Sequence, residues 1–165
     1  MSHQNRNESW VSRVLIADDD QAIRQLVCTI VQREGLEVDC VADGQEAIEQ
    51  LSQHSYAVIL LDLMMPRLDG FGVIEYLKEH PPAFKPVILV ITAYADQKFK
   101  EVDPNVVSGV LRKPFEVADL GNLVRLCVHG YDSQTRQELM SSHDRGMRDL
   151  ASHLPQIADR GNGAH

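Results

Sequence analysis

The segment Arg13-Val-Leu-Ile-Ala-Asp-Asp-Asp20 joins a short apolar run directly to three consecutive carboxylates. Residues 14–17 are rich in branched side chains and unbroken by polar ones, which is typical of a parallel strand covered on both faces. Adjacent like charges repel, and a carboxyl group near a dry core resists ionisation. The cluster therefore predicts a bound cation or a solvated exit from the core at this point.

Four more apolar runs of this kind follow along the chain, and helical patterns separate them. The runs are residues 38–41, 57–61, 87–91 and 106–111. Apolar residues at helical spacing predict helices at 21–33, from Asp43-Gly44 to beyond Leu51, from Phe71 to the Pro81-Pro82 pair, at 96–102 and at about 116–128. This alternation predicts an α/β fold, with a doubly wound parallel sheet of five strands and helices on both faces.

The bulk composition limits the classes of function. The chain has 165 residues, a formal charge of −8 and 44% hydrophobic residues, which suits one domain with a sizeable core. The charge argues against binding to nucleic acid or to an anionic membrane. No apolar run has the length of a membrane span, so we expect a cytoplasmic protein. Cys28, Cys40 and Cys127 lack metal-binding spacing and have apolar neighbours, and we interpret them as reduced core residues.

Polar side chains follow four of the expected strands. Asp18 to Asp20 follow the first strand, Asp62 ends the third, Thr92 ends the fourth and Lys113 follows the fifth. The carboxyl ends of parallel strands meet at one edge of the sheet, and ligands of doubly wound folds bind there. We therefore expect these groups to lie close together.

The chemistry of these groups favours metal-assisted phosphoryl transfer. Converging acids can hold Mg²⁺, which is satisfied by a few carboxylate and carbonyl oxygens and retained waters. A carboxylate beside Mg²⁺ can attack phosphorus, while an ammonium such as Lys113 and a hydroxyl such as Thr92 bind the transferred group. Taken alone, Asp18 and Asp19 could also be a solvated helix start favoured by the helix dipole.

Four segments together make the chain resemble a response-regulator receiver domain of bacterial two-component signalling. They are Val14-Leu-Ile-Ala-Asp-Asp-Asp20, Leu61-Asp-Leu-Met-Met-Pro-Arg-Leu-Asp-Gly70, Val90-Ile-Thr-Ala93 and Leu111-Arg-Lys-Pro-Phe115. Each is weak alone, but the set has the order and spacing of the family over roughly residues 13–128. The resemblance implies a flavodoxin-like (βα)5 fold with strand order 2-1-3-4-5.

The resemblance also implies a Mg²⁺ site. Asp18 and Asp19 match the acidic pair of the family, with Asp19 as a direct ligand and Asp18 acting through water. Asp62 and the main-chain carbonyl of Met64 complete the protein's share of the metal shell. Asp20 fits better as the N-cap of the first helix than as a ligand.

The phosphoryl group has its own matching residues. By the resemblance, Asp62 is the phosphoacceptor, Thr92 is the switch hydroxyl and Lys113 pairs with the phosphoryl group. The Lys113-Pro114 peptide bond is expected to be cis, as in the family.

The implied function is a phosphorylation switch that takes phosphate from a histidine kinase or a histidine phosphotransfer protein. It then presents an altered face to a downstream protein partner, or forms a phosphorylation-dependent homodimer. Such a protein is no enzyme in the usual sense, because it catalyses only its own phosphorylation and dephosphorylation. Two alternatives are a phosphorylation-independent interaction module and a Mg²⁺-dependent phosphatase with an aspartyl nucleophile. The complete set of site residues opposes the first, and Met64 in place of a second Asp opposes the other.

Three positions depart from common family patterns. Val110 lies three residues before Lys113, where many receivers have an aromatic switch residue. Met64 and Tyr94 lie two residues beyond Asp62 and Thr92, and both are bulky. We expect them to hinder the hydrolytic water and to prolong the phosphorylated state.

The domain organisation expected from the sequence has three parts. Residues 1–12 form a disordered lead-in, 13–130 the receiver domain and 131–165 a C-terminal extension too short for an ordinary output domain. Met140, His143, Met147, Leu150, Leu154 and Ile157 follow a spacing that allows one amphipathic helix before a disordered end. A frayed tail and a helix for dimerisation or docking both remain open.

Overall fold

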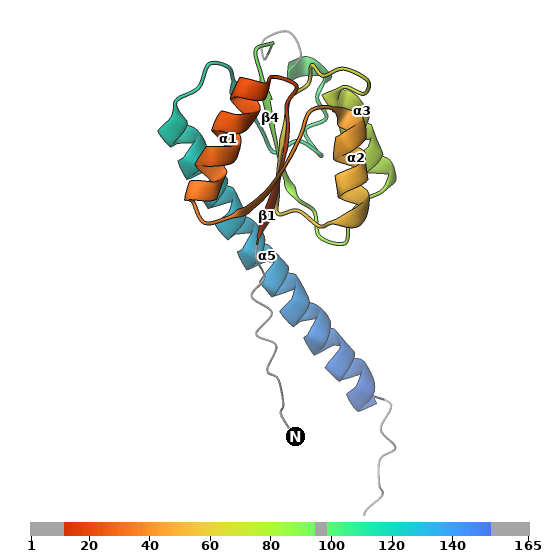
Figure 1. Cartoon of the computed structure of the whole chain (residues 1–165). Coiled ribbons are helices and arrows are strands. Elements are labelled where there is room, and N and C mark those ends of the chain that lie inside the picture. Colours follow the sequence, from red (N-terminus) through yellow and green to blue (C-terminus); the bar gives the residue numbers. More distant parts are fainter. Residues whose placement is uncertain (1–11, 95–98, 153–165) are drawn as a thin grey trace, which may run out of the picture. The chain divides into compact units, whose positions relative to one another are not determined.

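The structure is a computed structural model that describes residues 12–94 and 99–152 of the chain (Figure 1). Its sheet has five parallel strands in the order β2-β1-β3-β4-β5, which confirms the expected fold class and topology. The strands are β1 (Arg13–Ala17), β2 (Glu37–Val41), β3 (Val58–Leu61), β4 (Val87–Thr92) and β5 (Gly109–Arg112). The helices are α1 (Gln21–Arg33), α2 (Gly44–Gln53), α3 (Gly70–Glu79), the 3-10 helix η1 (Phe99–Glu101) and α5 (Val117–Ser152).

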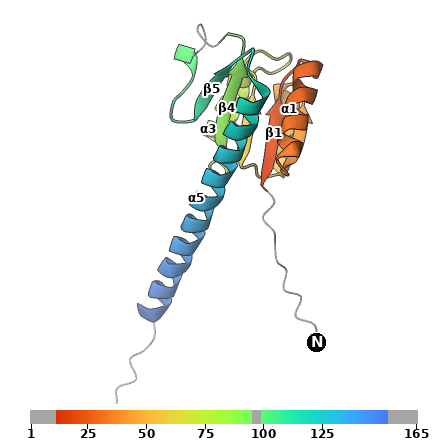
Figure 2. The same ribbon diagram turned by 90° about the vertical axis from the view of Figure 1, so that its left-hand side faces the viewer.

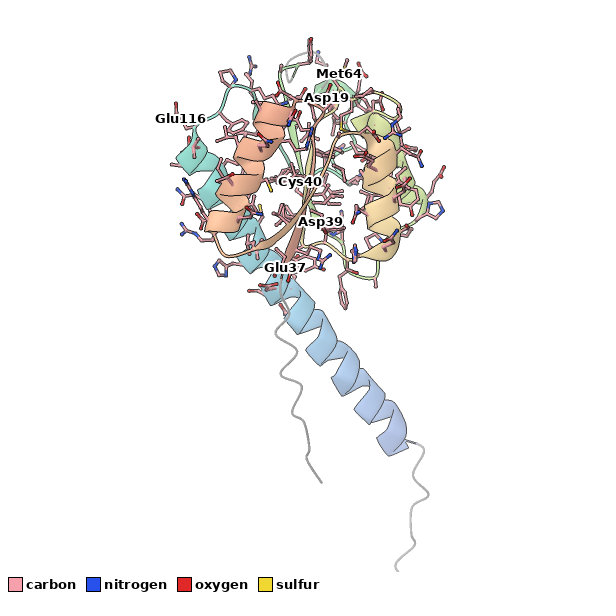
Figure 3. The ribbon with its side chains drawn as sticks, in the orientation of Figure 1. Asp19, Glu37, Asp39, Cys40, Met64 and Glu116 are labelled. Atoms are coloured by element: carbon pink, nitrogen blue, oxygen red, sulfur yellow. The ribbon has the colours of Figure 1, made fainter. Side chains whose placement is uncertain are left out.

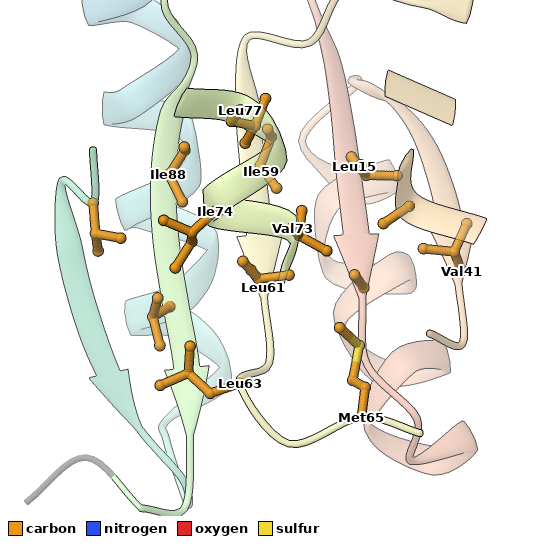
Figure 4. Close-up of a cluster of buried hydrophobic side chains, with 14 of the residues drawn as sticks. Leu15, Val41, Ile59, Leu61, Leu63, Met65, Val73, Ile74, Leu77 and Ile88 are labelled. Atoms are coloured by element: carbon orange, nitrogen blue, oxygen red, sulfur yellow. The ribbon is translucent and has the colours of Figure 1, made fainter. Parts of the chain in front are cut away.

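Helices cover both faces of the sheet, and each face has its own apolar core. On one face, the strands pack against α2 and α3 through a cluster that includes Leu15, Ile59, Leu61, Val73 and Ile74 (Figure 4). On the other face, alternate strand residues pack against α1 and the first turns of α5, which lie over the sheet beside β4 and β5 in Figure 2. Because successive strand residues point to opposite faces, runs that are apolar throughout supply both cores.

Aspartates begin three of the helices. Asp20 accepts hydrogen bonds from the backbone N–H groups of Ala22 and Ile23, so the expected N-cap of α1 is confirmed. Asp43 and Asp69 cap α2 and α3 in the same way. An N-cap carboxylate satisfies N–H groups that have no partner inside the helix, and it fixes where the chain turns from strand to helix.

The fifth strand begins later than the sequence pattern indicates. We expected a strand at 106–111, but β5 starts at Gly109. The backbone N–H groups of Val106 and Val107 donate to the carbonyl of Asp103 at 3.1 and 2.9 Å, which forms a turn before the strand. Val107 is nevertheless buried, so its apolar character reflects core packing from a turn rather than a strand.

The fourth helix is also different from the expectation of 96–102. Residues 96–98 lie outside the described residues, and the rest of this segment contains η1, a single 3-10 turn. The turn that follows is built on Asp103, whose carboxylate accepts a hydrogen bond from the N–H of Asn105 at 2.9 Å.

The last helix is much longer than expected. We expected its end near Val128 and left a frayed tail or a separate amphipathic helix open for the extension, but α5 is one helix from Val117 to Ser152. The residue near the expected break that weakens a helix most is Gly130. Glycine costs about 1 kcal/mol in a helix, whereas proline costs about 3 kcal/mol. Leu154, Pro155, Ile157 and the expected disordered end lie outside the described residues, as do residues 1–11 of the lead-in.

The chain divides into two compact units after Asp132. The first contains the sheet and its covering helices, and the second contains the helical residues from Ser133 onward. Ser12, the described end of the lead-in, belongs to the first unit, and its hydroxyl donates to the carboxylate of Asp132 at 2.7 Å.

The cysteines are less buried than we expected. Cys40 is exposed on β2, whereas Cys28 and Cys127 are partly buried on helices and pack against the core. Strand β2 is at the edge of the sheet, so its residues have a neighbouring strand on one side alone. An apolar run at the edge is therefore less buried than the same run in the centre.

Candidate functional site

The carboxyl ends of four strands bring the expected site residues together. Asp18 follows β1, Asp62 follows β3, Thr92 is the last residue of β4 and Lys113 follows β5. Backbone hydrogen bonds fix these ends, since Asp62 N–H donates to the carbonyl of Ala17 at 2.9 Å and Lys113 N–H to that of Thr92 at 3.0 Å. The peptide bond between Lys113 and Pro114 is cis, as expected.

A buried ion-pair cluster forms the centre of this edge. The ammonium of Lys113 donates to Asp18 Oδ2 at 2.6 Å and to Asp62 Oδ2 at 2.9 Å. Asp18 and Asp62 are only 3% and 6% exposed, so water screens their charges weakly. One ammonium thus neutralises part of the charge on two buried carboxylates.

The surroundings shift the pKa values within this cluster. Burial raises the pKa of Asp62 above its ordinary value, and the hydrogen bonds from Lys113 and from the N–H of Met64 offset only part of this effect. Burial lowers the pKa of Lys113, but its hydrogen bonds to Asp18 and Asp62 outweigh burial and leave the pKa raised. The lysine therefore stays charged, and the carboxylate of Asp62 is held at a free-energy cost that a further cation can relieve.

Asp19 extends this cluster toward solvent. Asp18, Asp19 and Asp62 each offer a carboxylate oxygen, and these oxygens lie within 4.8 Å of one another. Asp18 and Asp62 are buried while Asp19 is exposed, so a cation can enter from the open side. Figure 3 shows Asp19 and Met64 at the same end of the molecule. Hard oxygen donors at this separation, with net negative charge, fit a Mg²⁺ ion.

Thr92 and the two bulky neighbours have defined positions. Thr92 is completely buried, and its hydroxyl oxygen accepts a hydrogen bond from the N–H of Tyr94 at 3.2 Å. In the same way Asp62 Oδ1 accepts from the N–H of Met64 at 3.1 Å. The side chains of Met64 and Tyr94 are 47% and 49% exposed, so both are available to contact incoming groups. Val110 is partly buried against the core on the α2 and α3 face.

A second buried carboxylate supports the loop between β3 and α3, and the sequence analysis missed it. Asp43 is 4% exposed, and the guanidinium of Arg67 donates to it through Nε at 2.7 Å and through a second nitrogen. Burial alone raises the pKa of Asp43, but hydrogen bonds from Glu46 N–H and from Arg67 outweigh it, so the pKa is lowered. Arg67 has a φ of 61°, the left-handed region that few residues other than glycine adopt. Its ion pair with Asp43 holds this turn in place.

Two glycines let this loop approach its neighbours closely. Gly44 N–H donates to the carbonyl of Leu68 at 2.9 Å, and a Cβ at position 44 would lie 2.4 Å from that oxygen. At the start of α3, a Cβ on Gly70 would lie 2.4 Å from the carbonyl oxygen of Asp62. The backbone of Asp62 therefore lies in direct contact with the first residue of α3.

The loop after β1 has a comparable support that the sequence analysis did not identify. Arg24 of α1 donates to the carbonyl of Asp18 at 2.7 Å and to that of Asp19 at 3.3 Å. The N–H of Asp20 donates to Asp18 Oδ1 at 2.9 Å. In the sequence, an arginine one turn into a helix looks like an ordinary surface residue. Its support of the loop after β1 becomes visible only from its contacts in the folded structure.

Comparison with known proteins agrees with this fold and site. The family model of the response regulator receiver domain matches residues 14–125. The fold and the acidic edge thus define a receiver domain, and the chain belongs to the response regulator receiver family. Phosphorylation and Mg²⁺ binding at an acidic pocket are typical of this family. Within the described part of the chain, no helix has the length and apolar character needed to cross a membrane.

Individual relatives give the same result. The transcriptional regulatory protein SrrA of Staphylococcus aureus is 31% identical over 127 residues, which are 77% of this chain and 52% of SrrA. The chain therefore spans about half the length of the curated relatives it matches. The chemotaxis response regulator CheY4 of Vibrio cholerae is 30% identical with a TM-score of 0.64, covering 71% of this chain and 98% of that one. TrrA of Thermotoga maritima, solved in complex with Mg(2+)-BeF, is 26% identical with a TM-score of 0.62, covering 70% and 98%.

Proposed function

We propose that this protein is a two-component response regulator whose receiver takes a phosphoryl group from a phosphohistidine onto Asp62. The observation that carries this proposal is the cluster of Asp18, Asp62 and Lys113, with Lys113 bonded to both carboxylates at 2.6 and 2.9 Å. In a chain of the receiver family, that cluster combines an acceptor, a cation that binds the transferred group and acids that recruit a metal.

The donor set supports Mg²⁺ as the metal. Asp19 would be a direct ligand, Asp62 would share an oxygen, and Asp18 would act through water. The main-chain carbonyl of Met64 would complete the protein's share. When bound, Mg²⁺ would neutralise charge on the phosphoryl oxygens and on the carboxylates.

The residues of the chain have distinct tasks in the transfer. A carboxylate oxygen of Asp62 forms a bond to phosphorus as the bond from phosphorus to the donor imidazole nitrogen breaks, and the imidazole keeps the electron pair of that bond. Lys113 is already within hydrogen-bond distance of Asp62, so its ammonium binds a phosphoryl oxygen with little movement. Thr92 offers a hydroxyl at the end of the neighbouring strand, which would bind another phosphoryl oxygen.

The signal would then pass to a protein partner. Movement of the Thr92 hydroxyl toward the phosphoryl group would break its hydrogen bond with the N–H of Tyr94 and alter the loop after β4. The face near this loop, β5 and the start of α5 would bind a downstream protein or a second copy of the chain. We place the receiver at residues 13–130 and an extension at 131–165, and we place the protein in the cytoplasm, where histidine kinases present their phosphohistidine.

Phosphorylation by a small donor tests this function directly. Purified full-length protein is incubated with acetyl phosphate, with and without Mg²⁺, and its intact mass is measured for wild type and Asp62→Asn. We expect one phosphoryl group on the wild type that requires both Mg²⁺ and Asp62. No mass gain in folded protein that binds Mg²⁺ would contradict the proposal and favour a phosphorylation-independent interaction module.

A further inference from the structure

Two cysteines from different elements line one hollow on the surface of the receiver. Cys28 of α1 and Cys40 of β2 border a cavity of about 410 Å³, together with Gln21, Arg24, Gln25 and Thr29 of α1. Cys28 packs on the same core as Val38, and Cys40 is two residues further along β2 than Val38. Because side chains two apart on a strand point to the same face, Cys40 is directed toward α1. Figure 3 labels Cys40 on its strand beside this helix.

Cys28 and Cys40 border the same hollow. Burial of the Cys40 thiol, and after it the proximity of the Cys28 thiol, raise the pKa of Cys40 to about 12. Cys40 is exposed as a residue, so small molecules can reach the hollow that it borders. Cys127, the third cysteine, lies on α5 and does not line this hollow.

We propose that Cys28 and Cys40 form a redox-sensitive pair, which a low-molecular-weight disulfide oxidises to a disulfide bond between α1 and β2. In the first step the Cys28 thiolate, after losing its proton to solvent, attacks one sulfur of the small disulfide and releases one small thiolate. In the second step Cys40 gives up its proton and its sulfur attacks Cys28 Sγ, which releases the second small thiolate. The two cysteines lose two electrons, and both small thiolates take up protons from solvent. The retained proton on Cys40 makes the second step the slower one.

This pair is coupled to the acidic edge through Arg24. Arg24 borders the cysteine hollow, and its guanidinium donates to the carbonyls of Asp18 and Asp19. A disulfide bond between Cys28 and Cys40 draws α1 toward β2 and moves the part of α1 that carries Arg24. The loop that holds the two acidic residues then loses a support, so we expect Mg²⁺ affinity to fall by about threefold or more, because pre-organisation is lost. This part of the inference rests on the Mg²⁺ site of the proposed function.

Peptide mapping tests the bond without relying on any variant. The full-length protein is treated with oxidised glutathione or with dithiothreitol, blocked with iodoacetamide and digested with trypsin without reduction. Cleavage after lysine and arginine places Cys28 in residues 25–33, Cys40 in 34–67 and Cys127 in 126–136, so every pairing is distinguishable. We expect a linked peptide of 25–33 with 34–67 that dithiothreitol removes. Glutathione adducts on separate peptides, or unmodified Cys28 and Cys40, would overturn the proposal.

Matched variants and a Mg²⁺ titration complete the test. Cys127→Ser should keep the linked peptide, whereas Cys28→Ser and Cys40→Ser should each lose it. Mg²⁺ affinity is then measured on oxidised and reduced Cys127→Ser by calorimetry. Equal affinities of the two forms would overturn the coupling through Arg24. Absence of Mg²⁺ binding by the reduced form would count against the proposed function, while the linked peptide would still establish the disulfide.

Discussion

Asp62 and Asp43 are both almost completely buried and both contact a cation, yet their surroundings have opposite electrostatic effects. Asp62 shares the ammonium of Lys113 with Asp18, and its pKa is raised. Asp43 accepts from the guanidinium of Arg67 and from the N–H of Glu46, and its pKa is lowered. Burial of a carboxylate therefore does not by itself indicate a site. A buried carboxylate with too little compensating charge, such as Asp62, is suited to react with a cation or a phosphoryl group. A buried carboxylate whose charge is fully compensated by hydrogen bonds, such as Asp43, stabilises the fold.

The largest expected effect follows from removing the cation that contacts Asp62, which tests whether this carboxylate has a chemical role that Asp43 lacks. Lys113→Ala takes away the ammonium that lies 2.9 Å from Asp62, so we expect the rate of phosphorylation by acetyl phosphate to fall about 10²-fold. Intact mass against time measures this rate. Lys78→Ala is a matched control, because Lys78 pairs with Glu75 and Asp103 at 3.2 and 3.5 Å on the surface of α3. A Lys113→Ala rate within threefold of wild type would contradict the assignment.

Removal of the saturated carboxylate should affect folding rather than chemistry. Asp43→Ala loses the cap of α2 and the partner of Arg67, so we expect the free energy of unfolding to fall by about 1–3 kcal/mol. Urea denaturation measures this loss. Asp43→Asn separates the two effects, because asparagine keeps a capping oxygen but loses the charge. Loss of phosphorylation in folded Asp43→Ala with unchanged stability would reverse the distinction between the two aspartates.

The opposite pKa shifts predict opposite effects of neutralising each aspartate. The raised pKa of Asp62 means that its charged form destabilises the fold at neutral pH, so Asp62→Asn should raise stability by about 1 kcal/mol. The lowered pKa of Asp43 means that its charge stabilises the fold above the unfolded pKa, and this contribution is lost as pH falls through the folded value. Asp43→Asn should thus lower stability at pH 7 by a similar amount.

Urea denaturation between pH 7 and pH 3 measures both effects. The effect of Asp62→Asn should vanish at the acid end, because this aspartate is then protonated in both the folded and the unfolded wild type. The effect of Asp43→Asn should begin to decline there, because the unfolded chain takes up a proton that folded Asp43 resists. Shifts of the same sign at pH 7 would contradict the assigned electrostatics.

The smallest expected effect concerns the bulky side chains next to Asp62 and Thr92. Met64 and Tyr94 are exposed next to Asp62 and Thr92, whereas the Asp43 carboxylate is bound by Arg67. In Met64→Asn and Tyr94→Ala, water gains access to the phosphoryl group, so we expect dephosphorylation to quicken about threefold, less than 1 kcal/mol in the barrier. Loss of the phosphorylated mass over time measures it, with the exposed Leu126→Ala as control. Unchanged or slower loss in both variants would show that these side chains do not hinder water.

The sequence was sufficient to predict the edge at which the polar groups meet. Asp18, Asp62, Thr92 and Lys113 each end or follow a buried run, and parallel strands leave no other place for these residues than one edge of the sheet. The capping role of Asp20 was equally predictable, because it depends on residues next to it in the chain. Local patterns thus determined the position of the acidic cluster.

Long-range contacts were not predictable in this way. Arg67 pairs with Asp43, 24 residues earlier, and adopts a positive φ that no local pattern signals for an arginine. Val107 is buried from a turn, and its apolar character resembled that of a strand residue. Cys40 is exposed because its strand is at the sheet edge, and a run of apolar residues does not reveal which strand has one neighbour. Helix α5 continues past Gly130 because one glycine is too weak a signal to end a helix.

The close backbone contact between Gly70 and Asp62 limits which residues position 70 can accept. A single Cβ at position 70 would lie 2.4 Å from the Asp62 carbonyl oxygen and 2.8 Å from Leu63 Cα, and neither backbone atom can yield as a flexible side chain would. In a library of all substitutions at position 70, every replacement adds that same carbon. We therefore expect position 70 to tolerate no replacement, with alanine excluded as firmly as tryptophan. Exposed positions such as Leu126 should instead show effects that grow with the size and chemistry of the new side chain.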